Sequence, residues 1–160
     1  MEPLLLGELQ SLGLLGVADG SGGVVASVGS GSGAFSLYAA HGDGLLKVSG
    51  SSGYCVPLAS RPALVRALAA VNAALSEGTA EMDVVDGELR FRVSLPAAPR
   101  AGLQPLVQHV LRVCIAGYPP LAAAMEPLAR TAGSRRPTDA ELEAAAKAVA
   151  DDVAARLALA

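Results

Sequence analysis

The segment EMDVVDGELRFRVSL, residues 81–95, predicts a β-hairpin and constrains the fold more than any other part of the chain. In its second half apolar and polar residues alternate, which is the period of a strand with one buried face. Asp86-Gly87 matches a two-residue type I′ turn, whose central residues adopt positive φ. The register that follows pairs Val85 with Glu88, Val84 with Leu89, Asp83 with Arg90, Met82 with Phe91, and Glu81 with Arg92. One face is then apolar, with Phe91 in the core, and the other carries two acid–base pairs.

Composition fits one globular domain and argues against nucleic-acid binding. The chain has 160 residues, of which 52% are hydrophobic and 17% charged, enough apolar material for a substantial core. Aromatic residues make up only 3%, so platforms on which bases could stack are hard to build. The net charge of −3 lacks the basic footprint that phosphate backbones require. We therefore expect no nucleic acid among the partners.

The sequence predicts a soluble, cytoplasmic protein that does not bind membranes. The apolar start lacks a positively charged segment and carries Glu2 and Glu8, so it is a poor signal peptide. The long uncharged stretch at residues 20–42 is too rich in glycine and serine for a membrane helix. Cys55 and Cys114 are far apart and lie in apolar sequence surroundings, which favours two reduced, buried thiols.

The first half of the chain predicts a helix followed by a three-stranded meander. Leucines at helical spacing favour a short helix over residues 3–16. Three β-rich runs follow at residues 24–28, 34–40 and 45–48, and they are divided by glycine-rich segments typical of hairpin loops.

The second half predicts helices on either side of the hairpin. Ser60 is a candidate N-cap of a helix that Gly78 would end. A further helix begins near residue 103, and the Tyr118-Pro-Pro120 sequence would interrupt it. Thr138 and Glu141 match a capping box that opens an alanine-rich helix, with expected ion pairs Glu143–Lys147 and Asp152–Arg156.

The element order is therefore α-β-β-β-α-β-β-α plus a C-terminal helix. Runs of strands beside separate helices predict an α+β fold in which helices pack on an antiparallel sheet. We expect an α+β domain over residues 1–132, followed by a linker and the C-terminal helix over residues 133–160.

No pattern in the chain predicts catalysis, a cofactor or a metal site. His41 and His109 have no second ligand at metal-binding spacing, and there is no G-x-S-x-G nucleophile motif. The glycine-rich segments at residues 20–23 and 29–33 lack the phosphate-loop pattern and precede strands, so hairpin loops are their simpler interpretation. We expect a protein that is not an enzyme, with no catalytic residues and no cofactor.

Three polar residues, Asn72, Arg90 and Arg92, are candidates for structural or binding roles. Asn72 lies at the edge of an apolar helical face, where a bare amide is costly, so we expect it to be buried and hydrogen-bonded to a neighbouring backbone. Arg90 and Arg92 could form an anion patch, although cross-strand pairing with Asp83 and Glu81 would neutralise them.

Several short motifs follow one another in the stretch from Val56 to Leu121, which covers about 40% of the chain: Val56-Pro57, Arg61, Asn72-Ala-Ala-Leu75 followed by Gly78, Gly87-Glu-Leu-Arg-Phe-Arg92, Ser94-Leu-Pro96 and Tyr118-Pro-x-Leu121. In this order and spacing, they resemble the bacterial YbjN family. The element order is also similar to that of type III secretion chaperones, whose fold YbjN-like domains share. The resemblance implies a non-enzymatic domain, often dimeric, that binds protein segments or modulates a regulatory pathway, and it supplies no catalytic residues.

The leading hypothesis is thus a protein-binding module, chaperone-like or regulatory, that forms a homodimer. Its partner would be a protein client, and Tyr118 lies in one region that could carry the dimer contact. The other regions nominated for that contact are the thin apolar seam of the C-terminal helix and an uncovered edge of the meander. The alternative is a small-molecule or anion-binding domain that uses the glycine-rich loops with Arg90 and Arg92.

Overall fold

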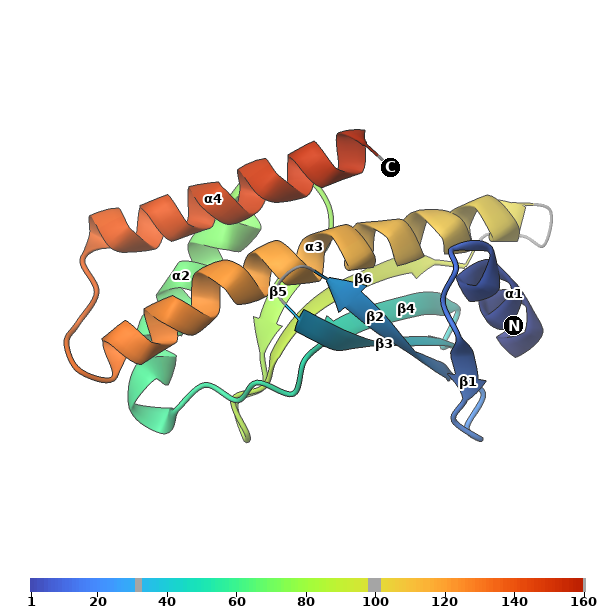
Figure 1. Ribbon diagram of the computed structural model, residues 1–160, viewed down its shortest axis with the longest axis horizontal. Helices are drawn as coiled ribbons and strands as arrows, with labels where there is room; N and C mark the ends of the chain where they lie inside the picture. Colours follow the sequence, from blue (N-terminus) through green and yellow to red (C-terminus); the bar gives the residue numbers. More distant parts are fainter. Residues whose placement is uncertain (31–32, 98–101, 160) are drawn as a thin grey trace.

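Helices cover one face of a six-stranded antiparallel sheet in the computed structural model, which describes residues 1–30, 33–97 and 102–159 (Figure 1). The sheet order is β1-β2-β3-β4-β6-β5. Its strands are β1 (Gly16–Ala18), β2 (Val24–Ser30), β3 (Gly33–Gly42), β4 (Leu45–Ser51), β5 (Thr79–Met82) and β6 (Leu89–Pro96). The helices are α1 (Glu2–Ser11), the 3-10 turn η1 (Leu58–Ser60), α2 (Arg61–Ala74), α3 (Leu103–Ala132) and α4 (Asp139–Ala158). The predicted α+β class is confirmed.

The helices form two layers above the sheet. Helix α3 lies along the sheet and contacts β4 and β6, with α1 and α2 beside it. Helix α4 packs on α2 and α3 and forms the outer layer (Figure 1). Alternate residues of the strands, such as Val24, Leu37, Val48 and Phe91, are buried beneath the helices, because successive strand side chains point to opposite faces. The other face of the sheet is open, so an antiparallel sheet with one covered face is the observed arrangement.

The predicted meander is confirmed as β2, β3 and β4, but its edges differ from the prediction. The short strand β1, which sequence reasoning missed, pairs with β2. On the other side β4 pairs with β6, so the hairpin joins the meander in one sheet. Strands of the same chain therefore pair with both sides of the meander, although β1 covers only the first three residues of β2.

The predicted register of the β5–β6 hairpin is wrong by two residues, although its faces are correct. Met82 lies opposite Leu89 instead of Phe91, and Glu81 lies opposite Arg90 instead of Arg92. A shift of two residues keeps every side chain on its face because strand alternation has a period of two. The ion pairs Asp83–Arg90 and Glu81–Arg92 still form, but they form diagonally.

The cause of the shift is a wider loop, residues 84–87. Asp83 N–H donates to the Glu88 carbonyl at 2.9 Å and closes this loop, in which Gly87 has positive φ but Asp86 does not. The Arg61 guanidinium donates to the carbonyl oxygens of three consecutive loop residues, Val84, Val85 and Asp86, at 2.7–3.1 Å. This contact from α2 supports the wider loop, and no local turn rule predicts it.

Helix α2 is bounded differently from the prediction. Ser60 makes no N-cap hydrogen bond; its buried hydroxyl donates instead to the Ala129 carbonyl of α3 at 2.7 Å. The helix ends at Ala74, and Gly78 is no C-cap glycine but the last residue before β5. The tertiary contacts of Ser60 and Gly78 thus replace the capping roles that local sequence favours.

Helix α3 is continuous, so the expected break at Tyr118-Pro-Pro120 is wrong. Pro119, Pro120 and Pro127 all lie inside the helix, where each removes an N–H donor. Tyr118 is buried, and its hydroxyl donates to Ser52 Oγ at 2.6 Å and accepts from Ser52 N–H at 2.7 Å. Packing of this stretch against the sheet outweighs the local preference for a break.

Helix α4 begins at the predicted capping box and buries the predicted seam. Thr138 and Glu141 make the reciprocal side-chain-to-backbone bonds of the box, and Leu142, Val149 and Val153 are buried. The Asp152–Arg156 pair is present at 3.0 Å, whereas Lys147 pairs with Asp151 and not with Glu143. Because α2 and α3 cover the seam, it is not an exposed dimer surface.

We expect the capping box to lose its stabilising effect in acid. Hydrogen bonds from Arg135 and from the Thr138 backbone and hydroxyl lower the pKa of Glu141 from its ordinary 4.5 to about 2. Because the folded pKa lies below the unfolded one, the stabilisation is complete above pH 4.5 and is lost as pH falls to about 2. NMR titration of the Glu141 carboxyl carbon should show a midpoint near 2. A midpoint at the ordinary value would contradict this, and Glu141→Gln should remove the response.

Candidate functional site: a groove beside the open half of strand β6

Strand β6 is longer than the edge strand that covers it. Strand β5 pairs only with the stretch from Leu89 to Arg92. The remaining stretch, from Val93 to Pro96, pairs with β4 on one side and has no strand of the described chain on the other. This half of β6 is therefore an open strand edge.

The backbone of Ser94 faces this open side. In an antiparallel ladder, successive residues direct their N–H and C=O groups to alternate sides. Leu89 N–H donates to the Tyr54 carbonyl on the β4 side, whereas the Glu88 carbonyl accepts from Asp83 on the β5 side. The backbone N–H and C=O groups of even-numbered β6 residues thus point toward the β5 side. Strand β5 begins at Thr79, opposite Arg92, so Ser94 has no β5 residue opposite it. The N–H and C=O of Ser94 point into the space that another strand would fill.

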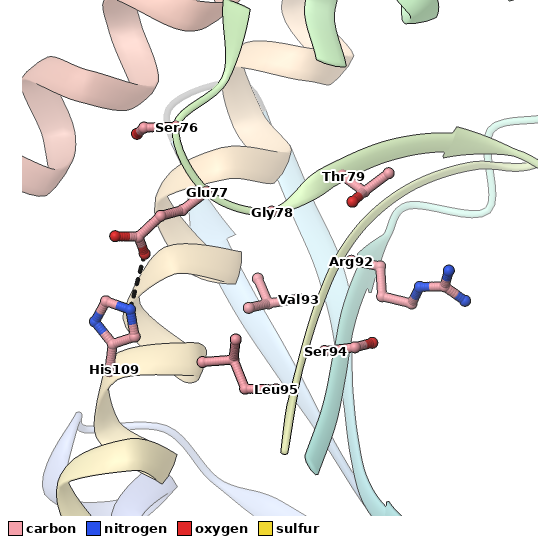
Figure 2. Close-up of a pocket in the computed structure, with 9 residues that line it drawn as sticks. All are labelled: Ser76, Glu77, Gly78, Thr79, Arg92, Val93, Ser94, Leu95 and His109. Atoms are coloured by element: carbon pink, nitrogen blue, oxygen red, sulfur yellow. Dashed lines mark ion pairs between the residues drawn. The ribbon is translucent and has the colours of Figure 1, made fainter. Parts of the chain in front are cut away.

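That space is a groove of about 450 Å³ (Figure 2). Its wall opposite β6 is the connection between α2 and β5, and His109 of α3 borders the groove on the helix side. His109 Nε2 lies 2.8 Å from a carboxylate oxygen of Glu77, and both side chains are about half exposed. The lining residues are Ser76, Glu77, Gly78, Thr79, Arg92, Val93, Ser94, Leu95 and His109.

Gly78 and Phe91 together explain why β5 starts late. Gly78 has a φ of 78°, a left-handed conformation that turns the chain out of line with the strand. A Cβ on Gly78 would overlap the Phe91 ring, so only glycine lets the backbone pass there. The turn carries Glu77 and Ser76 to the far wall of the groove instead of along β6.

The ionisable side chains that border the groove have partners within the chain. Arg92 forms an ion pair with Glu81 of β5, and His109 is paired with Glu77. The groove therefore combines open backbone groups, apolar side chains of β6 and a polar rim of paired side chains. Such a surface suits an uncharged main chain better than a strongly charged ligand.

Asn72 closes the outer edge of β5. Its side-chain NH₂ donates to the Ala80 carbonyl at 3.0 Å, and its side-chain oxygen accepts from Ala80 N–H at 2.8 Å. The expected hydrogen bonding to a neighbouring backbone is confirmed, whereas the expected burial is wrong because Asn72 is exposed. The amide occupies the outward backbone groups of Ala80, which hinders addition of a strand at that residue of β5.

Replacing Asn72 with leucine should lower the free energy of unfolding by about 1–3 kcal/mol, because Ala80 is buried and would lose both partners. Chemical denaturation of the purified protein measures this directly. The nearby Val65→Ala change, at an exposed position of α2, is the control and should stay within about 0.5 kcal/mol of wild type. A neutral or stabilising Asn72→Leu result would contradict the structural role.

Of the other residues nominated from sequence, only Arg92 lines the groove. Arg90 lies farther along β6, bound to Glu88 and Asp83, and its hydrogen bond to Glu88 raises the pKa of its guanidinium. Tyr118 belongs to the core. Sequence reasoning missed Ser94, Glu77 and His109 as groove residues. The one sequence signal was that the predicted strand at residues 88–95 is longer than the strand predicted to pair with it, residues 81–85.

The described residues give little support for a metal site or a membrane-spanning helix. No group of three or more His, Cys, Asp or Glu side chains in that part of the chain could hold a metal ion. Cys55 is exposed, contrary to expectation, while Cys114 is buried, and burial raises the pKa of its thiol. No helix within residues 1–30, 33–97 and 102–159 is long and apolar enough to cross a membrane.

Comparison of the chain with models of protein families and with curated proteins finds no match.

Proposed function

We propose that this protein is a non-enzymatic protein-binding module that takes an extended segment of a client as an added strand beside β6. The observation that carries the proposal is the open edge at Ser94, whose N–H and C=O face a groove instead of a strand. Strand addition uses main-chain hydrogen bonds for affinity and side-chain pockets for specificity. A chaperone-like or regulatory role is consistent with binding of this kind.

The groove defines the client segment that would fit. It must be extended over about three or four residues, since the open stretch runs from Val93 to Pro96. Side chains that face the helices would contact Leu95 and the His109–Glu77 pair, and an apolar residue suits this position. Side chains on the other face would lie on the open sheet surface beside Arg92.

The Ser94→Pro variant tests the open edge of β6 without disturbing the rest of the fold. Proline removes the outward N–H and obstructs strand docking, but it leaves the β4 ladder intact because Ser94 does not bond toward β4. Ser94→Ala, which removes only the hydroxyl, is the matched control. We expect Ser94→Pro to weaken client binding about tenfold or more and Ser94→Ala to have little effect.

The experiment is affinity capture from the source cell with wild type and both variants, followed by mass spectrometry and calorimetry on peptides from each captured protein. Partners lost with Ser94→Pro and retained with Ser94→Ala support the proposal. Partners retained equally by both variants would place the binding site elsewhere. A reproducible absence of protein partners, together with tight metabolite binding, would overturn the function itself.

We also propose that the chain forms a homodimer. The seam of α4 and the side chain of Tyr118 are covered within one chain, so the contact would use the open half of β6 or the open sheet face. Sedimentation at micromolar concentrations tests this against the chain mass of 16.0 kDa. A species of monomer mass throughout would rule the dimer out. A dimer lost only with Ser94→Pro would show that self-association and client binding share one edge.

A further inference from the structure

A second groove lies where α1, β2, α3 and α4 meet, and its lining is mostly apolar. It has a volume of about 500 Å³, within the range of about 300–1,000 Å³ common for small-molecule sites. The residues that line it are Leu12, Leu14, Val28, Arg112, Ile115, Ala116 and Arg156. In Figure 1, α3 lies between α1 and the C-terminal end of α4. The groove runs across α3, with residues that follow α1 on one side and Arg156 of α4 on the other.

The wall formed by the end of α1 is held firmly in place. The buried carboxylate of Glu8 accepts hydrogen bonds from the side-chain amides of Gln104, at 2.6 Å, and Gln108, at 2.7 Å, which fastens α1 to α3. Leu14 N–H then donates to the Leu9 carbonyl at 2.9 Å, so the chain turns back on the helix. These bonds hold Leu12 and Leu14 at this wall of the groove.

The opposite rim carries two arginine side chains, and one of them, Arg156, is paired with an aspartate. The buried residues Val149 and Val153 hold α4 on the neighbouring helices, and this packing brings Arg156 to the groove one turn later. Arg156 uses Nε and Nη2 to bind Asp152, at 3.0 and 3.2 Å, and a guanidinium carries five N–H donors, so others remain for a ligand. Arg112, exposed on α3, is the second charged residue of the lining. Both charged residues that line the groove are arginines.

We propose that this groove binds a monomeric amphiphile with an alkyl tail and an anionic head, of the alkyl carboxylate class. The tail would cover Leu12, Leu14 and Ile115, removing apolar surface from water. The carboxylate would accept charge-assisted hydrogen bonds from the arginine rim, whose planar guanidinium groups match a carboxylate. This site is separate from β6 and does not depend on client binding.

The probe is decanoate below its critical micelle concentration. Two comparison ligands each lack one recognised group, either the long alkyl tail or the anionic head. Butyrate keeps the carboxylate without the tail, and decyltrimethylammonium keeps the tail with the opposite charge. Calorimetry and NMR titration of the isotope-labelled full chain should show saturable decanoate binding, with shifts at Leu12, Leu14, Val28 and Ile115. Each comparison ligand should bind about tenfold more weakly or worse.

Charge variants at exposed positions complete the test without threatening the fold. Arg156→Gln should weaken decanoate binding about tenfold, and Arg156→Lys should restore part of it. Lys147→Gln is the matched control, because Lys147 is also an α4 cation paired with an aspartate four residues away, but it lies outside the groove. Its affinity for decanoate should equal that of wild type.

Three results would overturn the proposal. Equal binding of decanoate and decyltrimethylammonium would mean that the alkyl chain adsorbs without recognition of the head. Shifts confined to residues outside the groove would place the ligand elsewhere. Binding to anionic vesicles without saturable binding of monomeric decanoate would show attraction to a charged surface, not a ligand site.

Discussion

Phe91→Ala is expected to lower the free energy of unfolding by about 3–5 kcal/mol, as for other buried phenylalanines. The Phe91 side chain is fully buried on β6, lies against Gly78 and Gly117, and is the largest fully buried side chain among the described residues. Since a domain of this kind is stable by only about 5–15 kcal/mol, the variant should lose much of its stability. Urea denaturation followed by circular dichroism measures the difference.

Val84→Ala is the control for that experiment. Val84 lies on the same hairpin but is 82% exposed, so its truncation should change stability by no more than about 0.5 kcal/mol. If both variants lost the same stability, the hairpin as a whole and not the burial of Phe91 would be responsible. A loss below about 1 kcal/mol for Phe91→Ala would be incompatible with the packing described.

Gly117→Ala should destabilise the protein by about 1–3 kcal/mol, although alanine is normally the better helix residue. Gly117 lies in α3 directly over the Phe91 ring, and a Cβ there would overlap several ring atoms. Gly78 lies against the same ring atoms, so the ring cannot move toward Gly78 to make room. Thermal or chemical unfolding should therefore show the opposite sign from the usual helix substitution.

Gly7→Ala provides the matched comparison for Gly117→Ala. Gly7 is also inside a helix, α1, but a Cβ there would meet nothing within 4 Å. Alanine at this position should stabilise the protein by about 0.5–1 kcal/mol. Parallel effects of the two substitutions would show that helix propensity decides both cases and that the contact with Phe91 is unimportant.

Sequence reasoning succeeded where the signal was a repeating pattern. The alternation in β6 placed Phe91 in the core, and it was insensitive to the error in register because a two-residue shift preserves the faces. The capping box at Thr138 was equally readable, since both of its partners lie within one helical turn.

The failures share one cause, which is contact between residues far apart in the sequence. The loop at Asp86-Gly87 is wider than the predicted two-residue turn, and Arg61 of α2 supports it. Helix α3 continues through Pro119 and Pro120 because packing outweighs the local preference for a break. The groove itself arises from a difference in strand length that Gly78 imposes through its contact with Phe91. Periodicity in a single segment contains no information about such contacts.

The uncovered half of β6 has a cost for the cell that makes this protein. An open strand edge offers the same hydrogen bonds to any extended chain, including an unfinished or unfolded copy of itself. Occupation by a client would shield this edge and also raise the stability of the fold, by about 2.7 kcal/mol at a ligand concentration one hundred times the dissociation constant. The amount of soluble protein would then depend on the supply of its client, and overproduction without the client would favour aggregation.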